Sequence, residues 1–130
     1  MNITVNDKSI EIDEEGFLVD PRDWSEDVGL ELVKQHEAAG HKKVTETGWM
    51  LVKFFRQFYD ENMRHPHMNE LIRMRSKLDG KDFEKEEHDY KEEHDYKEFL
   101  YELFPHGPIR MLAKLAGLSQ VSIAQEVTGG

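Results

Sequence analysis

Residues 101–118 read YELFPHGPIRMLAKLAGL, and this stretch decides the fold. Pro105 and Pro108 flank a short turn, and a helix-like apolar run follows directly. Pro108 stands in the first turn of the predicted helix and Gly117 just past its end, where each residue type is favoured. Segments near chain ends usually fray. A helix with such clear start and stop signals at this place therefore indicates a functional role. It either precedes a reactive side chain on the following segment or faces a partner.

Helical spacing of apolar residues also predicts three earlier helices, at about 26–38, 46–63 and 69–78. Thr45 is suited to cap the second, and Asp23 or Ser25 the first. Gly40 and Gly80 end the first and third, and Pro66 disfavours helix at the residue before it. The residues expected to face the core are Val28, Leu32, His36, Trp49, Leu51, Val52, Phe54, Phe55, Phe58, Tyr59, Leu71, Ile72, Met74 and Leu78.

The first residues predict a β-hairpin. Two β-branched runs, ITV and SIEI, are joined by Asn6, Asp7 and Lys8, a composition typical of turns. With 130 residues, 38% of them hydrophobic, one core is expected. The sequence therefore predicts a mainly α fold, a helical bundle with an N-terminal hairpin at about 1–13, as a single domain over 1–130.

Composition excludes several function classes. The 27 Asp and Glu residues outnumber the 17 Lys and Arg residues, and a formal charge of -10 opposes general binding to phosphate backbones. The absence of cysteine excludes disulfides, thiolate metal sites and a persulfide on this chain. No apolar run reaches the roughly 20 residues of a membrane span, and the start lacks the pattern of a signal peptide. No membrane partner and a cytoplasmic location are expected.

A charged repeat interrupts the apolar pattern. KEEHDY occurs at 85–90 and again at 91–96. A six-residue step rotates a helix by roughly 600°, so the copies face different directions and build no continuous apolar stripe. We expect a solvated insertion at about 84–97, after which FLYELF returns to the core.

Seven sequence pieces together resemble the DsrC/TusE sulfur-relay family, also described as gamma-subunit-like proteins of dissimilatory sulfite reductase. They are DEEGFL at 13–18, DW at 23–24, W at 49, FFRQFYDE at 54–61, P at 66, LFPHGP at 103–108 and AGL at 116–118. The resemblance spans nearly the whole chain and implies the same bundle with an N-terminal hairpin.

The resemblance also implies two cysteines that this chain lacks. In members that move sulfur, the last helix carries one cysteine and the C-terminal arm a second. The corresponding positions here hold Ala113 and, by spacing, Ala124. We therefore expect no catalytic residue and no enzyme, although a family label of sulfurtransferase is possible. The expected role is non-catalytic or regulatory, in competition with a cysteine-bearing paralogue for partners of sulfur-relay or sulfite-reductase type. The expected contact residues are Pro105, His106, Gly107, Pro108 and Arg110.

The sequence gives weaker support to other kinds of site. No two of the seven histidines have the i,i+4 spacing of a metal-binding helix face, and the acidic runs are typical of a solvated surface, so neither metal nor cofactor is expected. The alternative function is DNA binding, because MLAKLAGLSQVSIAQEVTGG at 111–130 resembles a helix-turn-helix, with Gly117 at the turn and Ser119 as the cap of the second helix, in the C-terminal segment 118–130. Gln120, Ser122 and Gln125 would then read bases, but basic residues nearby are few.

Overall fold

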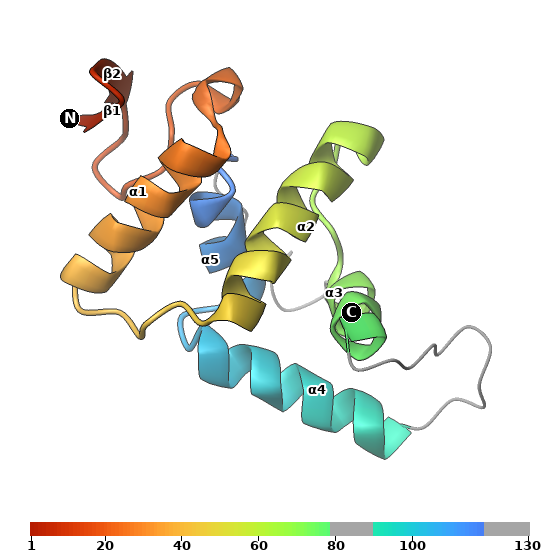
Figure 1. Cartoon of the computed structure of the whole chain (residues 1–130). Helices are drawn as coiled ribbons and strands as arrows, with labels where there is room; N and C mark the ends of the chain where they lie inside the picture. Colours follow the sequence, from red (N-terminus) through yellow and green to blue (C-terminus); the bar gives the residue numbers. More distant parts are fainter. Residues whose placement is uncertain (79–89, 119–130) are drawn as a thin grey trace.

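The computed structural model describes residues 1–78 and 90–118 (Figure 1). Over these residues the chain forms a two-stranded hairpin, one 3₁₀ turn and five helices, which confirms the predicted fold class. The elements are β1 (Asn2–Val5), β2 (Lys8–Glu11), the 3₁₀ turn Pro21–Asp23, α1 (Glu26–Ala38), α2 (Glu46–Asn62), α3 (Met68–Leu78), α4 (Tyr90–Leu103) and α5 (Pro108–Leu115). No helix in the described ranges is long and apolar enough to cross a bilayer.

The hairpin is closed by a two-residue turn. Asn6 and Asp7 both have positive φ, 52° and 65°, the geometry that matches the twist of antiparallel strands. Lys8 already belongs to β2, so the turn is one residue shorter than predicted. Ile3 pairs with Ile10, and both side chains are buried, so one face of the hairpin joins the core.

Side-chain caps set the starts of α1 and α2. Ser25 Oγ accepts from the Val28 backbone N–H at 3.2 Å, and Thr45 Oγ1 accepts from that of Gly48 at 3.1 Å. Asp20 caps the separate 3₁₀ turn instead. Each cap satisfies an N–H that the first helical turn leaves unpaired, so the predicted starts follow from local chemistry.

The core gathers around α5, which lies between α1 and α2, with α4 crossing at one end (Figure 1). Most of the predicted core positions are confirmed as buried, and Trp49, Phe54, Phe58, Tyr59 and Met74 are half-buried at the rim. The side chain of Leu78 is outside the described set. The core side chains with no exposed surface are Leu51, Val52, Phe55, Leu71, Leu100, Ile109, Leu112, Ala113, Leu115, Ala116 and Leu118.

Apart from Tyr90, the first residue of α4, the repeat is described only in its second copy. The charged and imidazole side chains described in this segment are exposed, as expected of a solvated insertion. They are His94, Asp95, Lys97 and Glu98. Tyr96 differs, because its half-buried ring packs against the core and Arg75 lies over it at 5.7 Å. One aromatic residue of the repeat therefore does contact the core.

Candidate functional site

The turn between α4 and α5 presents its tip to solvent. Pro105 and His106 are exposed, whereas Gly107 and Pro108 are buried and Arg110 is half-buried. The Gly107 N–H donates to the Phe104 carbonyl at 3.0 Å, which closes the turn. Gly107 has a φ of 112°, a conformation that side-chain-bearing residues rarely adopt. Of the five predicted contact residues, the turn thus exposes two and uses two as its base.

Two side chains from distant segments hold the other end of α5. Trp24 Nε1 donates to the Leu115 carbonyl at 3.0 Å, and Arg56 Nη1 donates to the Ala116 carbonyl at 3.1 Å. The Arg56 guanidinium also lies over the Trp24 ring at 5.4 Å. These bonds satisfy carbonyls that a helix end leaves unpaired. The short helix that follows the turn is therefore fixed at both ends.

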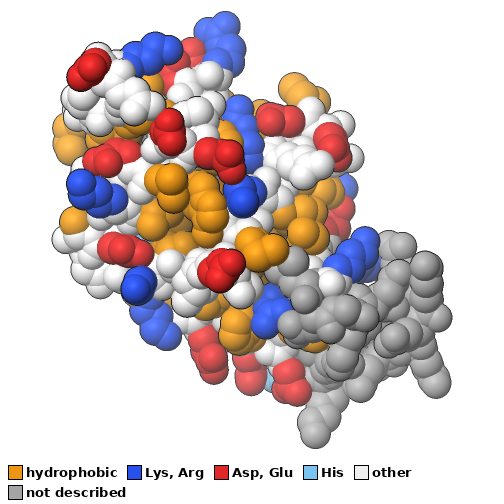
Figure 2. Space-filling view, viewed as in Figure 1, with side chains coloured by type: hydrophobic (Ala, Val, Ile, Leu, Met, Phe, Trp, Pro, Cys, Tyr) orange, Lys and Arg blue, Asp and Glu red, His pale blue; other side chains and the backbone are white. Residues whose placement is uncertain are grey.

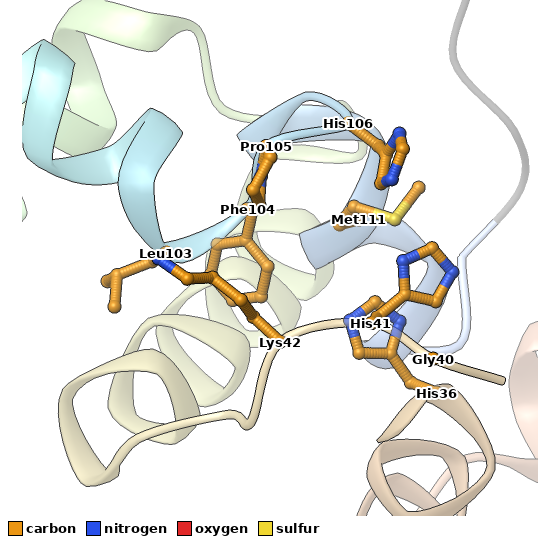
Figure 3. Close-up of a pocket in the computed structure, with 9 residues that line it drawn as sticks. All are labelled: His36, Gly40, His41, Lys42, Leu103, Phe104, Pro105, His106 and Met111. Carbon is orange, nitrogen blue, oxygen red and sulfur yellow. The ribbon is translucent and has the colours of Figure 1, made fainter. Parts of the chain in front are cut away.

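A half-enclosed cavity of about 150 Å³ lies beside the turn (Figure 3). The end of α1 and the loop after it contribute His36, His41 and Lys42 to the cavity wall. The α4–α5 turn contributes His106, and α5 contributes Met111. The three imidazoles lie close together, with His41 between the other two (Figure 3).

The end of α1 explains how two of these rings meet. Gly40, at a φ of 96°, donates to the Glu37 carbonyl at 3.0 Å. The His41 N–H then reaches back to the His36 carbonyl at 3.3 Å, which completes a Schellman motif. This motif sets the residue after the glycine against the third-last helical residue. As a result the two rings stack, with centroids 4.2 Å apart and planes at 7°.

Burial and positive neighbours lower the pKa of two of these histidines, His36 and His41. Burial lowers the pKa of His36 to about 4, with smaller effects of His41, Lys114 and His106 in the same direction. Burial and then Lys114 lower the pKa of His41. The pKa of Lys114 is itself lowered by burial, against the attraction of Asp13 and Glu15. Near neutral pH, His36 thus offers one N–H donor and one nitrogen acceptor.

Sequence reasoning placed His36 on the buried face of its helix, which is confirmed, but it did not find the cavity. The missed signal is a histidine followed four residues later by Gly40 and then His41, the spacing of a Schellman motif. For His106, the sequence predicted a place in the turn but not in the cavity wall.

The position of the family's helix cysteine is buried. Ala113 has no exposed surface. Ala124 and the DNA-reading candidates Gln120, Ser122 and Gln125 lie outside the described residues, as does Ser119. Within the described ranges, no three His, Asp or Glu side chains are grouped to hold a metal ion.

Comparison with known proteins gives one consistent family. The sequence profile of the DsrC like protein family matches residues 4–122. The sulfurtransferase TusE of Photorhabdus laumondii is 34% identical over 111 residues, which cover 85% of this chain and 86% of that one. The sulfurtransferase TusE of Pectobacterium atrosepticum is 32% identical over 111 residues, 85% of this chain and 88% of that one.

Solved structures agree. The NMR structure of DsrC from Allochromatium vinosum has a TM-score of 0.67 and 30% identity, and the match covers 93% of this chain and 95% of that one. The oxidised gamma-subunit of dissimilatory sulfite reductase from Archaeoglobus fulgidus shares the fold, with a TM-score of 0.67 at 24% identity over 94% of this chain and 97% of that one.

These relatives correct one expectation. The prediction that the chain is no enzyme is wrong, because relatives that match most of its length carry the name sulfurtransferase. The absent cysteine excludes one covalent step on this chain, and it did not justify excluding the class. Nothing in the comparisons supports the helix-turn-helix alternative. By the profile match, the curated relatives and the fold, the chain belongs to the DsrC family.

Proposed function

We propose that this chain takes part in sulfur relay by binding a protein that carries the sulfur on its own cysteine. The observation that carries the proposal is the full burial of Ala113 on α5. The end of this helix is held by hydrogen bonds from Trp24 and Arg56, so the helix is well formed without a cysteine at position 113. With no cysteine in the chain, the sulfur-bearing thiol belongs to the partner. The proposed setting is the cytoplasm.

The proposed contact surface is the α4–α5 turn, with Pro105 and His106 at its tip and Arg110 beside it. The buried Gly107 and Pro108 hold the tip, so little conformational freedom is lost on binding. Partners of sulfite-reductase or sulfur-relay type are favoured by the names of the similar proteins. Occupying a surface shared with a cysteine-bearing paralogue would let the chain regulate that paralogue.

Site-specific photo-crosslinking tests the proposal. A photoreactive amino acid replaces His106 in one variant and the exposed Asp95 of α4 in a matched control. After irradiation in extract of the native cells, captured proteins are identified by mass spectrometry. We expect position 106 to capture proteins that carry cysteine persulfides, and position 95 not to capture them.

A persulfide donor added before crosslinking gives a second measurement. We expect the added sulfur mass on the captured partner, with the mass of this chain unchanged, because it has no thiol. Equal capture at both positions, or capture only of proteins without a reactive cysteine, would contradict the proposed role.

A further inference from the structure

The cavity beside the α4–α5 turn contains an unpaired buried polar atom. His36 is 3% exposed, and its Nδ1 makes no hydrogen bond to any described residue. The His41 ring stacks on the His36 ring, and the His106 ring meets His41 edge to face, with centroids 5.1 Å apart and planes at 88°. Neither ring forms a hydrogen bond with His36 Nδ1. A buried polar nitrogen without a partner costs stability, and a ligand that pairs with it recovers that cost.

The charges around the cavity favour an anion. Its wall includes Lys42 and no carboxylate. Lys114 lies near enough on the α5 side to lower the pKa of His36 and His41. Asp13 and Glu15 face Lys114 but are absent from the cavity wall. A positive field of this kind attracts an anion and repels a metal ion.

The arrangement of the rings also disfavours a metal. Rings stacked at 7° place their nitrogens side by side, whereas metal ligands must converge on one point. Consistently, no metal-binding group of three such side chains occurs in the described part of the chain. Side-by-side donors instead suit a ligand with several acceptor atoms.

We propose that this cavity binds a small inorganic oxyanion, with the ring N–H groups of His36, His41 and His106 as donors. The volume of about 150 Å³ is roughly ten times the space that one water needs, enough for a small polyatomic anion. Since the site is formed by this chain alone, the proposal does not depend on the partner-binding function, and either can fail without the other.

Binding of the anion is coupled to protons. A bound negative charge stabilises imidazolium, so it raises the pKa of His36 and His41 from their lowered values. Lys114 is the basic side chain that acts on both rings, and the His106 ring meets the His41 ring edge to face. The affinity therefore rises as the pH falls.

The test is an NMR titration of the imidazole nitrogens with thiosulfate and with sulfate, which stay ionised over the range used. The ionic strength is fixed with chloride, and the pH is about 7.5 or about 5.5, on either side of the ordinary histidine value. We expect saturable shifts of His36, His41 and His106, with the exposed His94 unmoved, and binding at least about fivefold tighter at the lower pH.

Two variants complete the test. His106→Asn, at an exposed position that leaves folding intact, should weaken binding about tenfold, whereas His94→Asn should not weaken it. Shifts that rise linearly without saturation, that appear equally at His94, or that persist unchanged in His106→Asn would overturn the proposal. So would Zn²⁺ saturating the same rings where the anions do not.

Discussion

The C-terminal ends of α1 and α5 have the same backbone motif, a Schellman motif, in different surroundings. At α5 the Gly117 N–H donates to the Lys114 carbonyl at 3.1 Å, and the Leu118 N–H to the Ala113 carbonyl at 2.9 Å. The α1 end repeats this pattern at Gly40 and His41. Both glycines have positive φ, 96° at Gly40 and 72° at Gly117.

The surroundings differ completely. A Cβ on Gly117 would lie 2.7 Å from Leu18 Cδ1 and 2.8 Å from Trp24 Cγ, whereas a Cβ on Gly40 would meet nothing within 4 Å. At α5 the motif joins two apolar residues inside the core, and at α1 it stacks two imidazoles at the wall of a cavity. The same motif therefore serves packing at one end and the placement of polar groups at the other.

The largest expected effect is that of Gly117→Ala. The left-handed conformation costs about 1–2 kcal/mol for a residue with a Cβ, and the contact with Trp24 and Leu18 adds about 1–3 kcal/mol of overpacking. We expect a loss of about 3 kcal/mol or more in the free energy of unfolding, measured by urea denaturation. A loss below about 1 kcal/mol would show that the packing around this glycine yields easily.

The next effect is the pH dependence that the α1 end contributes. His36 has a pKa of about 4 when folded and an ordinary value of about 6.5 when unfolded, so between these values the unfolded chain binds the extra proton. Stability therefore falls as the pH drops through this window, by about 3 kcal/mol in all at 1.36 kcal/mol per unit.

His36→Gln tests that prediction, because glutamine does not titrate. Urea denaturation at several pH values should give a flatter stability curve for this variant between pH of about 6.5 and 4. His94→Gln, at an exposed position of α4, should keep the slope of the parent chain. Identical slopes for the parent chain and His36→Gln would assign the acid sensitivity to other groups.

Trp24→Phe tests the contacts that fix the α5 end, with a smaller effect. The change removes the indole N–H that donates to the Leu115 carbonyl at 3.0 Å and leaves most of the ring packing. We expect a loss of about 1–2 kcal/mol in urea denaturation, the value of a hydrogen bond whose acceptor stays buried. Trp49→Phe is the matched control, because its half-buried indole donates no hydrogen bond to a described residue. An equal loss in both variants would attribute the effect to ring size alone.

The sequence predicted the fold well because local rules set its elements. Caps at Ser25 and Thr45, the turn after Val5 and the proline that begins α5 each act over a few residues, so their pattern is visible in the chain. The apolar spacing then identified the buried faces, including that of His36.

The cavity could not be predicted from such local rules, because its wall is formed by segments that meet only in the folded chain. His36 and His41 meet through a helix-end motif, but His106 joins them only when α5 packs beside α1. Tyr96 was missed for a related reason, since its contact with Arg75 comes from α3 and not from the repeat. The enzyme class was missed because a single absent residue type was given more weight than the retained scaffold.

The smallest expected effect is that of Gly40→Ala, and it sharpens the comparison of the two helix ends. With nothing near the added Cβ, only the left-handed conformation is penalised, and we expect a loss of about 1 kcal/mol in urea denaturation. Gly40→Asn should recover most of that loss, because asparagine adopts this conformation more readily. Gly117→Asn should recover nothing, since the space beside Trp24 and Leu18 is already filled. If asparagine proved equally tolerated at both positions, backbone conformation alone would account for the two glycines, and the packing of the α5 end would need another explanation.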